Sequence, residues 1–363
     1  MTEFRPATGT PAEPAFGERT GKEVKLHTGK FEEGRWSYLY GNDTEYRAQM
    51  PDLEAIEQAA RAARTGDLPD VVQGPVINAP VWTCEIPLYF WFGGIAAGSS
   101  FVAFACDLAG DEDSAAVARK VALAALAPSP PLLIMDLGRP ERFYNMLRIF
   151  KPRSPMSMGA WALTLFGNLA AGTVGADLLG RRRLARSLGA ATAVVGGYLG
   201  SYTGVLLAST AVPVWARSRL FLGPIFVSTA AATGAAACRL TLVATGLPVG
   251  HPTRNALGTV ETGAMAAELA LSILNARQLG ELASGLESGR PGRLFRFAKW
   301  SVRAGLASRF ARKRGGPWVH HAASVLYLAA GLAFRYAWVG AGRQSAQHDE
   351  VVAQMARERR SGS

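Results

Sequence analysis

The chain has 363 residues, of which 49% are hydrophobic, and it carries a formal net charge of +11. Its apolar residues gather in blocks of about twenty, which is the length a helix needs to cross a hydrocarbon core of ~30 Å. The basic residues stand mainly in the connections between these blocks, where they bias membrane topology, and no aromatic and basic recognition module accompanies them. The composition predicts a polytopic membrane protein and argues against a nucleic-acid-binding protein.

We expect an all-α fold, a polytopic transmembrane helix bundle of about seven to eight spans. The seven apolar blocks lie at residues 82–108, 117–137, 160–179, 188–208, 220–243, 258–282 and 320–339. An eighth span arises if the basic stretch after Gly289 enters the bilayer. The domains expected are a polar N-terminal arm (1–80), a transmembrane domain (81–340) and a polar C-terminal tail (341–363).

The N-terminal arm is rich in Gly, Pro, Thr and charged residues, a composition that predicts an extended, irregular segment. Its residues 34–46 concentrate four aromatic side chains, namely Trp36, Tyr38, Tyr40 and Tyr46. Such a cluster suits docking against a partner, and it equally suits folding back on the same protein. Residues 51–64 are expected to form a short helix.

The first span begins with an acidic residue among aromatic and small ones. Glu85 lies near its start, beside Trp82, Tyr89 and Trp91, which are typical of an aromatic belt at the membrane interface. Small residues at 93–99 form a face that lets another helix approach closely. Two roles are open for Glu85: a carboxylate that snorkels to the surface, or one that handles protons or binds a ligand.

The connection between the second and third blocks mixes charged, proline and aromatic residues more than a plain membrane loop requires. It begins at Asp136, on the edge of an apolar block, where an acid is costly unless it is paired or used. Its basic residues are Arg139, Arg142, Arg148, Lys151 and Arg153, and its aromatic residues are Phe143, Tyr144 and Phe150. We take this loop as the centre of the function.

Polar residues inside the later spans are further candidates for chemistry. Tyr198 and Tyr202 share one helical face, and either phenol could bond a buried carbonyl or serve ordinary contacts between helices. Glu261 and Glu268 share a face of the sixth span, and Arg335 lies inside the seventh. An ion pair between Glu268 and Arg335 would make both tolerable in lipid. The three charged residues also outline a candidate proton path.

The most basic part of the chain precedes the last span. Within residues 290–318, basic and apolar side chains separate onto two helical faces. The basic face holds Arg296, Lys299 and Arg303, and the apolar face holds Leu294, Ala298, Val302 and Leu306. This pattern is typical of a helix in the headgroup region of an anionic leaflet. Placing this segment and the Asp136 loop in the cytoplasm also places the N-terminus there, although the arginines at 181–183 then fall on the other side.

Residues that bind redox metals are scarce. The three cysteines are widely separated and no CxxC pair exists, which argues against an iron–sulfur cluster or zinc site built by this chain. The five histidines are not placed to face one another across spans, as axial haem ligands do. We therefore expect no metal cofactor.

Three stretches of the chain resemble the polysulfide-reductase membrane-anchor family, the NrfD/PsrC type. They are the small-residue first span, the Asp136 loop with the start of the next span (136–163), and residues 202–234. The resemblance covers roughly residues 82–244. It implies a haem-free, multi-span subunit that binds a quinone, menaquinone or another membrane quinone, between its helices.

The resemblance also implies which residues surround the quinone head. The quinone-binding and proton-transfer residues expected are Glu85, Tyr89, Asp136, Arg139, Tyr198 and Tyr202, with the choice between the two later tyrosines open. Quinone reduction takes up two electrons and two protons, so the site needs hydrogen-bond donors and a route for protons. A phenol can donate, a buried carboxyl with a raised pKa can shuttle a proton, and Arg139 could hold Asp136 in place.

Partners follow from the same resemblance. It implies electron exchange with a separate four-cluster, ferredoxin-like iron–sulfur subunit, which serves a catalytic subunit that is commonly molybdopterin-dependent. This chain would not be catalytic alone. The residues expected to dock an acidic iron–sulfur partner are Arg142, Tyr144, Arg148, Lys151 and Arg153. The location implied is the plasma membrane of a prokaryote, among membrane lipids.

Two other functions compete with the quinone-reactive anchor. The chain could serve as a non-redox membrane tether or assembly scaffold. It could instead be an ion-translocating subunit, in which Glu261, Glu268 and Arg335 matter more than Asp136.

Overall fold

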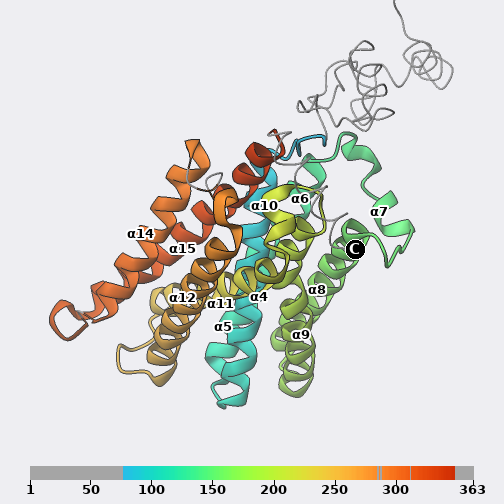
Figure 1. Cartoon of the computed structure of the whole chain (residues 1–363). Helices are drawn as coiled ribbons and strands as arrows, with labels where there is room; N and C mark the ends of the chain where they lie inside the picture. The colour runs from blue at the N-terminus through green and yellow to red at the C-terminus, as the bar shows by residue number, and fades with distance from the viewer. Residues whose placement is uncertain (1–76, 284–285, 287, 311, 348–363) are drawn as a thin grey trace, which may run out of the picture. The chain divides into compact units, whose positions relative to one another are not determined.

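The structure, a computed structural model, describes residues 77–283, 286, 288–310 and 312–347, and every regular element within them is a helix (Figure 1). Trp82–Asp136 and Pro140–Ser345 form one compact helical unit, and Leu137–Arg139 groups with the flanking segments in a second unit. The aromatic cluster at 34–46, the helix expected at 51–64 and most of the C-terminal tail lie outside the described residues.

Within the described residues, six helical segments are long and apolar enough to cross a membrane. They are Glu85–Leu108 (α4), Glu112–Met135 (α5, Glu112–Leu126, with α6, Ser129–Met135), Arg182–Ala208 (α9), Arg219–Ala244 (α11), Pro252–Leu279 (α12) and His321–Ala346 (within α15, Arg312–Ala346). The prediction of an all-helical, multi-span protein is confirmed for the described residues.

Two more long helices and four short ones complete the unit. The long ones are α8 (Pro155–Leu178) and α14 (Gly289–Phe310), and the short ones are η1 (Pro140–Arg142), α7 (Asn145–Arg148), α10 (Pro213–Arg217) and η2 (Gly280–Ala283). Each of the seven apolar blocks predicted from sequence coincides with a long helix or with the α5–α6 pair. The block at 160–179 forms α8, which is not among the six segments.

Local sequence explains where several helices begin. Ser154 caps α8 by accepting a hydrogen bond from the backbone N–H of Ser157, and Pro155 follows as the first helical residue, a position where its missing N–H costs nothing. Asp111 caps α5 in the same way through Ser114. Between α4 and α5, Gly110 has φ +77°, a left-handed conformation that favours glycine and turns the chain back.

The centre of the helical unit is the crossing of α4 and α11. A Cβ atom on Gly98 would overlap the backbone carbonyl of Ala230, and one on Gly234 would overlap the backbone of Gly98. Only glycine lets two helix backbones approach so closely. α4 also packs on α5 and α9, while α8 packs on α9 and α12 on α11, so this crossing sets the spacing of the whole unit, as the small-residue pattern predicted.

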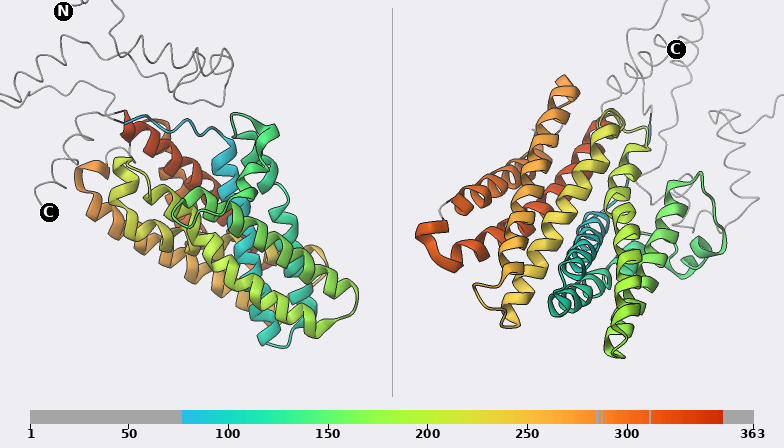
Figure 2. Two further views of the ribbon diagram at one scale, coloured as in Figure 1. Left: turned by 90° about the vertical axis from the view of Figure 1, so that its right-hand side faces the viewer. Right: turned by 90° about the horizontal axis from the view of Figure 1, so that it is seen from below.

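α14 packs antiparallel along α15 at one edge of the unit (Figure 2). Pro291 faces Gly340, the ring of Phe295 stacks on that of Phe334 with centroids 5.7 Å apart, and Gly305 faces Tyr327. Ala298 and Val302 are buried, as the predicted apolar face requires. These contacts run along the candidate span of α15, and the headgroup position expected for this segment stays a prediction.

We predict that Gly98→Ala destabilises the protein by about 1–3 kcal/mol, the usual cost of forcing extra atoms into a packed interior. Thermal unfolding of the purified protein measures this cost. Gly93→Ala in the same helix is the matched control, because nothing lies within 4 Å of the added Cβ there. Equal melting temperatures for the two variants would contradict the close crossing.

Candidate functional site

The candidate site lies at the end of the helical unit where α4 begins, which we call the Glu85 end. Successive long helices run in alternating directions, so the end of α6, the start of α8 and the end of α9 come to the same place. The hydroxyl of Tyr202, near the end of α9, donates to the backbone carbonyl of Pro155 at the start of α8. Glu112 and Arg186 pair at the opposite end, with oxygen and nitrogen 2.6 Å apart.

Two carboxyl groups meet at the Glu85 end. Glu85, in the first turn of α4, is half-buried and accepts a hydrogen bond from the hydroxyl of Thr83. Asp136 is the half-buried residue that caps the C-terminus of α6. Burial raises the pKa of Asp136 to about 6, and the negative charge of Glu85 adds to the rise. At neutral pH this carboxyl is therefore close to the point where it takes up a proton.

Two tyrosines are buried at the same end of the helical unit. Tyr89 on α4 is 3% exposed and Tyr202 on α9 is 4% exposed, and the two interact electrostatically. Tyr198 stacks on Tyr202 with ring centroids 5.7 Å apart, but it is 42% exposed. Of the two tyrosines left open by the sequence, the buried one is in the better position to bond a ligand between the helices.

Gly159, which sequence reasoning did not single out, leaves the space that the Tyr202 ring occupies. A Cβ atom at this position would overlap the phenol ring and its hydroxyl. The residue stands one turn after Pro155, so the first turn of α8 both receives the hydroxyl and makes room for the ring. Nothing in the sequence pattern marks Gly159, because its role depends on a side chain 43 positions away in another helix.

Arg139 belongs with Leu137 and Gly138 to the second compact unit, whereas Asp136 belongs to the helical unit. The expected role of Arg139 beside Asp136 stays a prediction.

The basic loop that follows projects from the helical unit. All residues from Glu141 to Asn145 and from Leu147 to Arg153 are exposed. Among them are the predicted docking residues Arg142, Tyr144, Arg148, Lys151 and Arg153. Phe150 packs its ring edge against Trp161 of α8, with centroids 5.9 Å apart. We call residues 140–154 the flap, a surface on which basic and aromatic side chains stand together.

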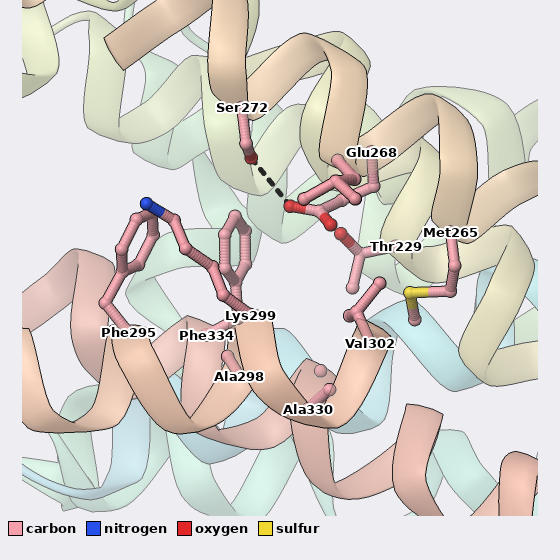
Figure 3. A pocket seen from close by; sticks show the side chains of 12 residues that line it. Thr229, Met265, Glu268, Ser272, Phe295, Ala298, Lys299, Val302, Ala330 and Phe334 are labelled. Atoms are coloured by element: carbon pink, nitrogen blue, oxygen red, sulfur yellow. Dashed lines mark hydrogen bonds between the residues drawn. The ribbon is translucent and has the colours of Figure 1, made fainter. Parts of the chain in front are cut away.

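Glu268 lies in a crevice of about 310 Å³, a volume that includes its open mouth. Figure 3 shows Glu268 and Ser272 on one side and Phe295 with Lys299 of α14 on the other. The hydroxyl of Ser272 donates to the Glu268 carboxylate at 2.7 Å. Lys299 reaches over the Phe295 ring, 4.4 Å from its centroid.

Glu268 and Arg335 interact electrostatically, but they do not form the close ion pair that the sequence suggested. Among the described residues, no nitrogen of Arg335 lies within 4.0 Å of a Glu268 oxygen. The guanidinium, 1% exposed, donates instead to the Phe226 carbonyl at 3.2 Å and lies 3.8 Å from the Phe226 ring centroid. The sequence placed Glu268 and Arg335 at similar positions along their spans, but it did not reveal the direction in which each side chain points.

Glu261 has partners that the sequence did not suggest. It is fully buried, pairs with Arg309 of α14, accepts a hydrogen bond from Ser324 at 2.9 Å, and lies 3.8 Å from Arg239. These contacts satisfy the carboxylate from three helices. They indicate a structural role for Glu261, and the cluster lies toward the end opposite Glu85.

A second buried ionic cluster was also missed. Arg119 of α5 holds Asp107 of α4 at 2.5 Å and Asp177 of α8 at 2.7 Å, and its side chain is 5% exposed. This clamp joins three helices at the end opposite Glu85. The sequence held one signal that could have revealed this cluster: its three charged residues stand near the same end of three successive spans.

Metal-binding groups do not assemble in the described part of the chain. Within those residues, no cluster of three or more His, Cys, Asp or Glu side chains could hold a metal ion.

The family comparison gives an independent result. A family model described as Polysulphide reductase, NrfD matches residues 75–276. That range holds Glu85, Asp136 and Tyr202, and it ends before α14. No curated protein matches the chain.

We predict that the Asp136 carboxyl titrates near pH 6, protonated below this value and ionised above it. Since the folded value exceeds the ordinary one of about 3.9, the fold favours the protonated form, and this stabilisation is lost as the pH rises through 6. Infrared difference spectroscopy of the carboxyl band, with Asp136→Asn to assign it, measures the titration. Glu85→Gln should lower the pKa. Titration near pH 4 in both proteins would contradict the burial argument.

Proposed function

The chain belongs to the NrfD polysulphide reductase family, and we propose that it is the quinone-binding membrane anchor of an oxidoreductase complex. The observation that carries the proposal is Asp136, a carboxyl with a pKa raised to about 6, beside Glu85 and near two buried tyrosines. Family membership supports the class of protein, and this cluster supports the place of the site.

The residues present fit a quinone head. Tyr202 supplies a phenol donor, whose hydroxyl now bonds the Pro155 carbonyl and could turn to a quinone oxygen instead. Asp136 can hold a proton or release it near neutral pH, as a general acid or base requires. A membrane quinone, menaquinone or a related one, supplies the two-electron chemistry.

Glu85 is proposed as the second proton-handling group. Its charge helps to raise the pKa of Asp136, so a proton on one carboxyl favours ionisation of the other. Tyr89 closes the buried side of the site. Arg139 is proposed to hold the Asp136 carboxyl in place.

The flap is proposed as the docking surface for a four-cluster iron–sulfur subunit. Its exposed arginines, lysine and aromatic rings suit an acidic partner, since opposite charges steer association. The flap begins four residues after Asp136 in the chain, so a docked partner is proposed to stand next to the quinone site. That subunit would serve a catalytic subunit, molybdopterin-dependent or of another kind.

We propose eight spans in a prokaryotic plasma membrane. The six apolar segments are joined by α8, which is 24 residues long, and by α14, which pairs with α15. The two ends of α14 then lie on opposite sides of the membrane. The segment 290–318 therefore no longer supports a cytoplasmic N-terminus, and the flap alone remains as the basis for that orientation.

Ion translocation is the second candidate function. The observation that favours it is Glu268, a buried acid in a crevice with Ser272 and Lys299. Glu261 contributes less to this candidate, because its carboxylate is already satisfied by Arg309 and Ser324. A non-redox tether remains the expectation if no quinone binds.

We predict that Asp136→Asn lowers quinone turnover of the purified complex by about 100-fold or more, the usual contribution of a proton-transfer group. Tyr202→Phe should lower turnover by about tenfold, since one hydrogen bond is lost. Tyr198→Phe is the matched control and should change little, because Tyr198 is 42% exposed and its loss leaves the Tyr202 hydroxyl in place. Quinone content of the purified protein separates binding from chemistry.

Glu268→Gln discriminates between the two functions. If it abolishes proton uptake and Asp136→Asn leaves electron transfer intact, ion translocation through α12 replaces the quinone site as the account of function.

We predict that Arg148→Glu with Lys151→Glu reduces recovery of the iron–sulfur subunit by at least about tenfold, because like charges at an interface cost several kcal/mol. Binding of the unaltered protein should weaken as salt is added. Arg183→Glu, an exposed arginine at the opposite end, is the control. Equal losses with Arg183→Glu would count against the flap.

A further inference from the structure

The end of the flap is fastened to the first turns of α8 by one side chain. The hydroxyl of Ser157 accepts a hydrogen bond from the backbone N–H of Lys151 at 3.0 Å and donates to the backbone carbonyl of Ile149 at 3.3 Å. These two groups flank Phe150, whose ring packs edge-on against Trp161 with centroids 5.9 Å apart. Ser157 and Trp161 are four positions apart in α8 and therefore share one face of the helix. This face holds the three consecutive flap residues, which we call the clamped segment.

The same turn of α8 supplies the acceptor for the Tyr202 hydroxyl. That acceptor is the backbone carbonyl of Pro155, two residues before Ser157. Gly159, two residues after Ser157, leaves the space for the phenol ring. Ser154 caps this turn by accepting a hydrogen bond from the backbone N–H of Ser157 at 3.4 Å. One helical turn thus contacts the flap through a side chain and Tyr202 through its backbone.

The hydroxyl of Ser157 does not bond within its own helix. Serine and threonine hydroxyls inside helices commonly bond a carbonyl three or four residues earlier, as those of Thr164 and Thr173 do in α8 itself. Ser157, which is half-buried, uses both its donor and its acceptor on the flap. Its side chain therefore links two segments of the chain.

The connection between the clamped segment and α8 is short enough to transmit a movement of the flap. Three residues separate the clamped segment from the first residue of α8, and within them the backbone N–H of Ser154 donates to the Lys151 carbonyl at 3.0 Å. The segment and the turn are thus joined by the chain, by this hydrogen bond and by Ser157. A partner that binds the exposed side chains of the flap acts on the same backbone that carries the Pro155 carbonyl.

We propose that Ser157 is a positioning residue through which the flap controls the hydrogen bond of Tyr202. With the flap clamped, the first turn of α8 keeps the phenol on the Pro155 carbonyl. A subunit docked on the flap moves the clamped segment away from α8, displaces that carbonyl, and leaves the hydroxyl to bond a quinone oxygen. The docked subunit must bind the released flap more tightly than the clamped one, because a partner shifts an equilibrium only through its different affinity for the two states. This inference rests on the proposed function and adds control of the quinone site by docking.

The test reads the Tyr202 hydroxyl in the full chain, purified without a partner subunit. Vibrational bands of isotope-labelled tyrosine report phenol hydrogen bonding, and Tyr202→Phe assigns the band. Ser157→Ala and Phe150→Ala should each shift this band, because each removes a contact of the clamped segment. Phe150→Ala should add no further shift in the Ser157→Ala background, since both changes open the same link. Ser157→Thr, which keeps the hydroxyl, should retain the original band.

Phe143→Ala is the matched control for Phe150→Ala. Phe143 is also an exposed flap residue, but its ring packs on Tyr144, with centroids 6.4 Å apart, and it lies outside the clamped segment. Its replacement should leave the Tyr202 band in place. An unmoved band in Phe150→Ala, or shifts that add in the double variant with Ser157→Ala, would overturn the proposal.

Quinone binding separates this proposal from the proposed function. A short-chain naphthoquinone should bind Ser157→Ala about fivefold more tightly than the unaltered chain, the factor that one hydrogen bond contributes, and Tyr202→Phe should remove this gain. Equal binding by the two proteins refutes control by the flap and leaves the proposed function intact. Absence of binding in both, with a band that still responds to Phe150→Ala, refutes the proposed function and supports the link between the flap and Tyr202.

Discussion

The backbone contact of α4 and α11 at Gly98 and Gly234 is the constraint on which the other distances depend. Because no side chain separates the two helices, α9 can lie against both, and Tyr202 reaches the start of α8. Glu85, Tyr89 and Gly98 all stand on α4, so the helix that makes the tight crossing also carries one half of the candidate site. Widening the crossing would move Tyr89 away from Tyr202 without altering either residue.

Buried charge is distributed unequally between the two ends of the helical unit. Opposite Glu85, Arg119 is held by two aspartates and Glu261 by Arg309 and Ser324, and such satisfied clusters join helices. At the Glu85 end, burial leaves Asp136 near its titration point and a like charge stands beside it. Carboxyl groups whose pKa is shifted by burial and by a like charge are typical of sites that move protons. The fold thus keeps its structural charges apart from those proposed for chemistry.

Sequence patterns predicted the features that depend on one segment at a time. Runs of apolar residues located the helices, and the position of Asp136 at the edge of a run marked it as a candidate for chemistry. Features that join distant segments were missed. Arg119 with Asp177, Glu261 with Arg309, and Tyr202 with Gly159 are defined by which helix faces which, and a pattern within one helix does not contain that information. The same gap hid the contact of Arg335 with Phe226 and the packing of α14 along α15.

Photoaffinity labelling of the purified complex with an azidoquinone, followed by peptide mapping, tests the central claim most directly. The account predicts label on the start of α4 around Glu85 and Tyr89, on the end of α6 near Asp136, and on α9 near Tyr202, with excess unlabelled quinone preventing it. Label confined to the crevice between α12 and α14, at Glu268 or Lys299, in a complex that still turns over quinone would contradict the account and move the site to the other side of α11.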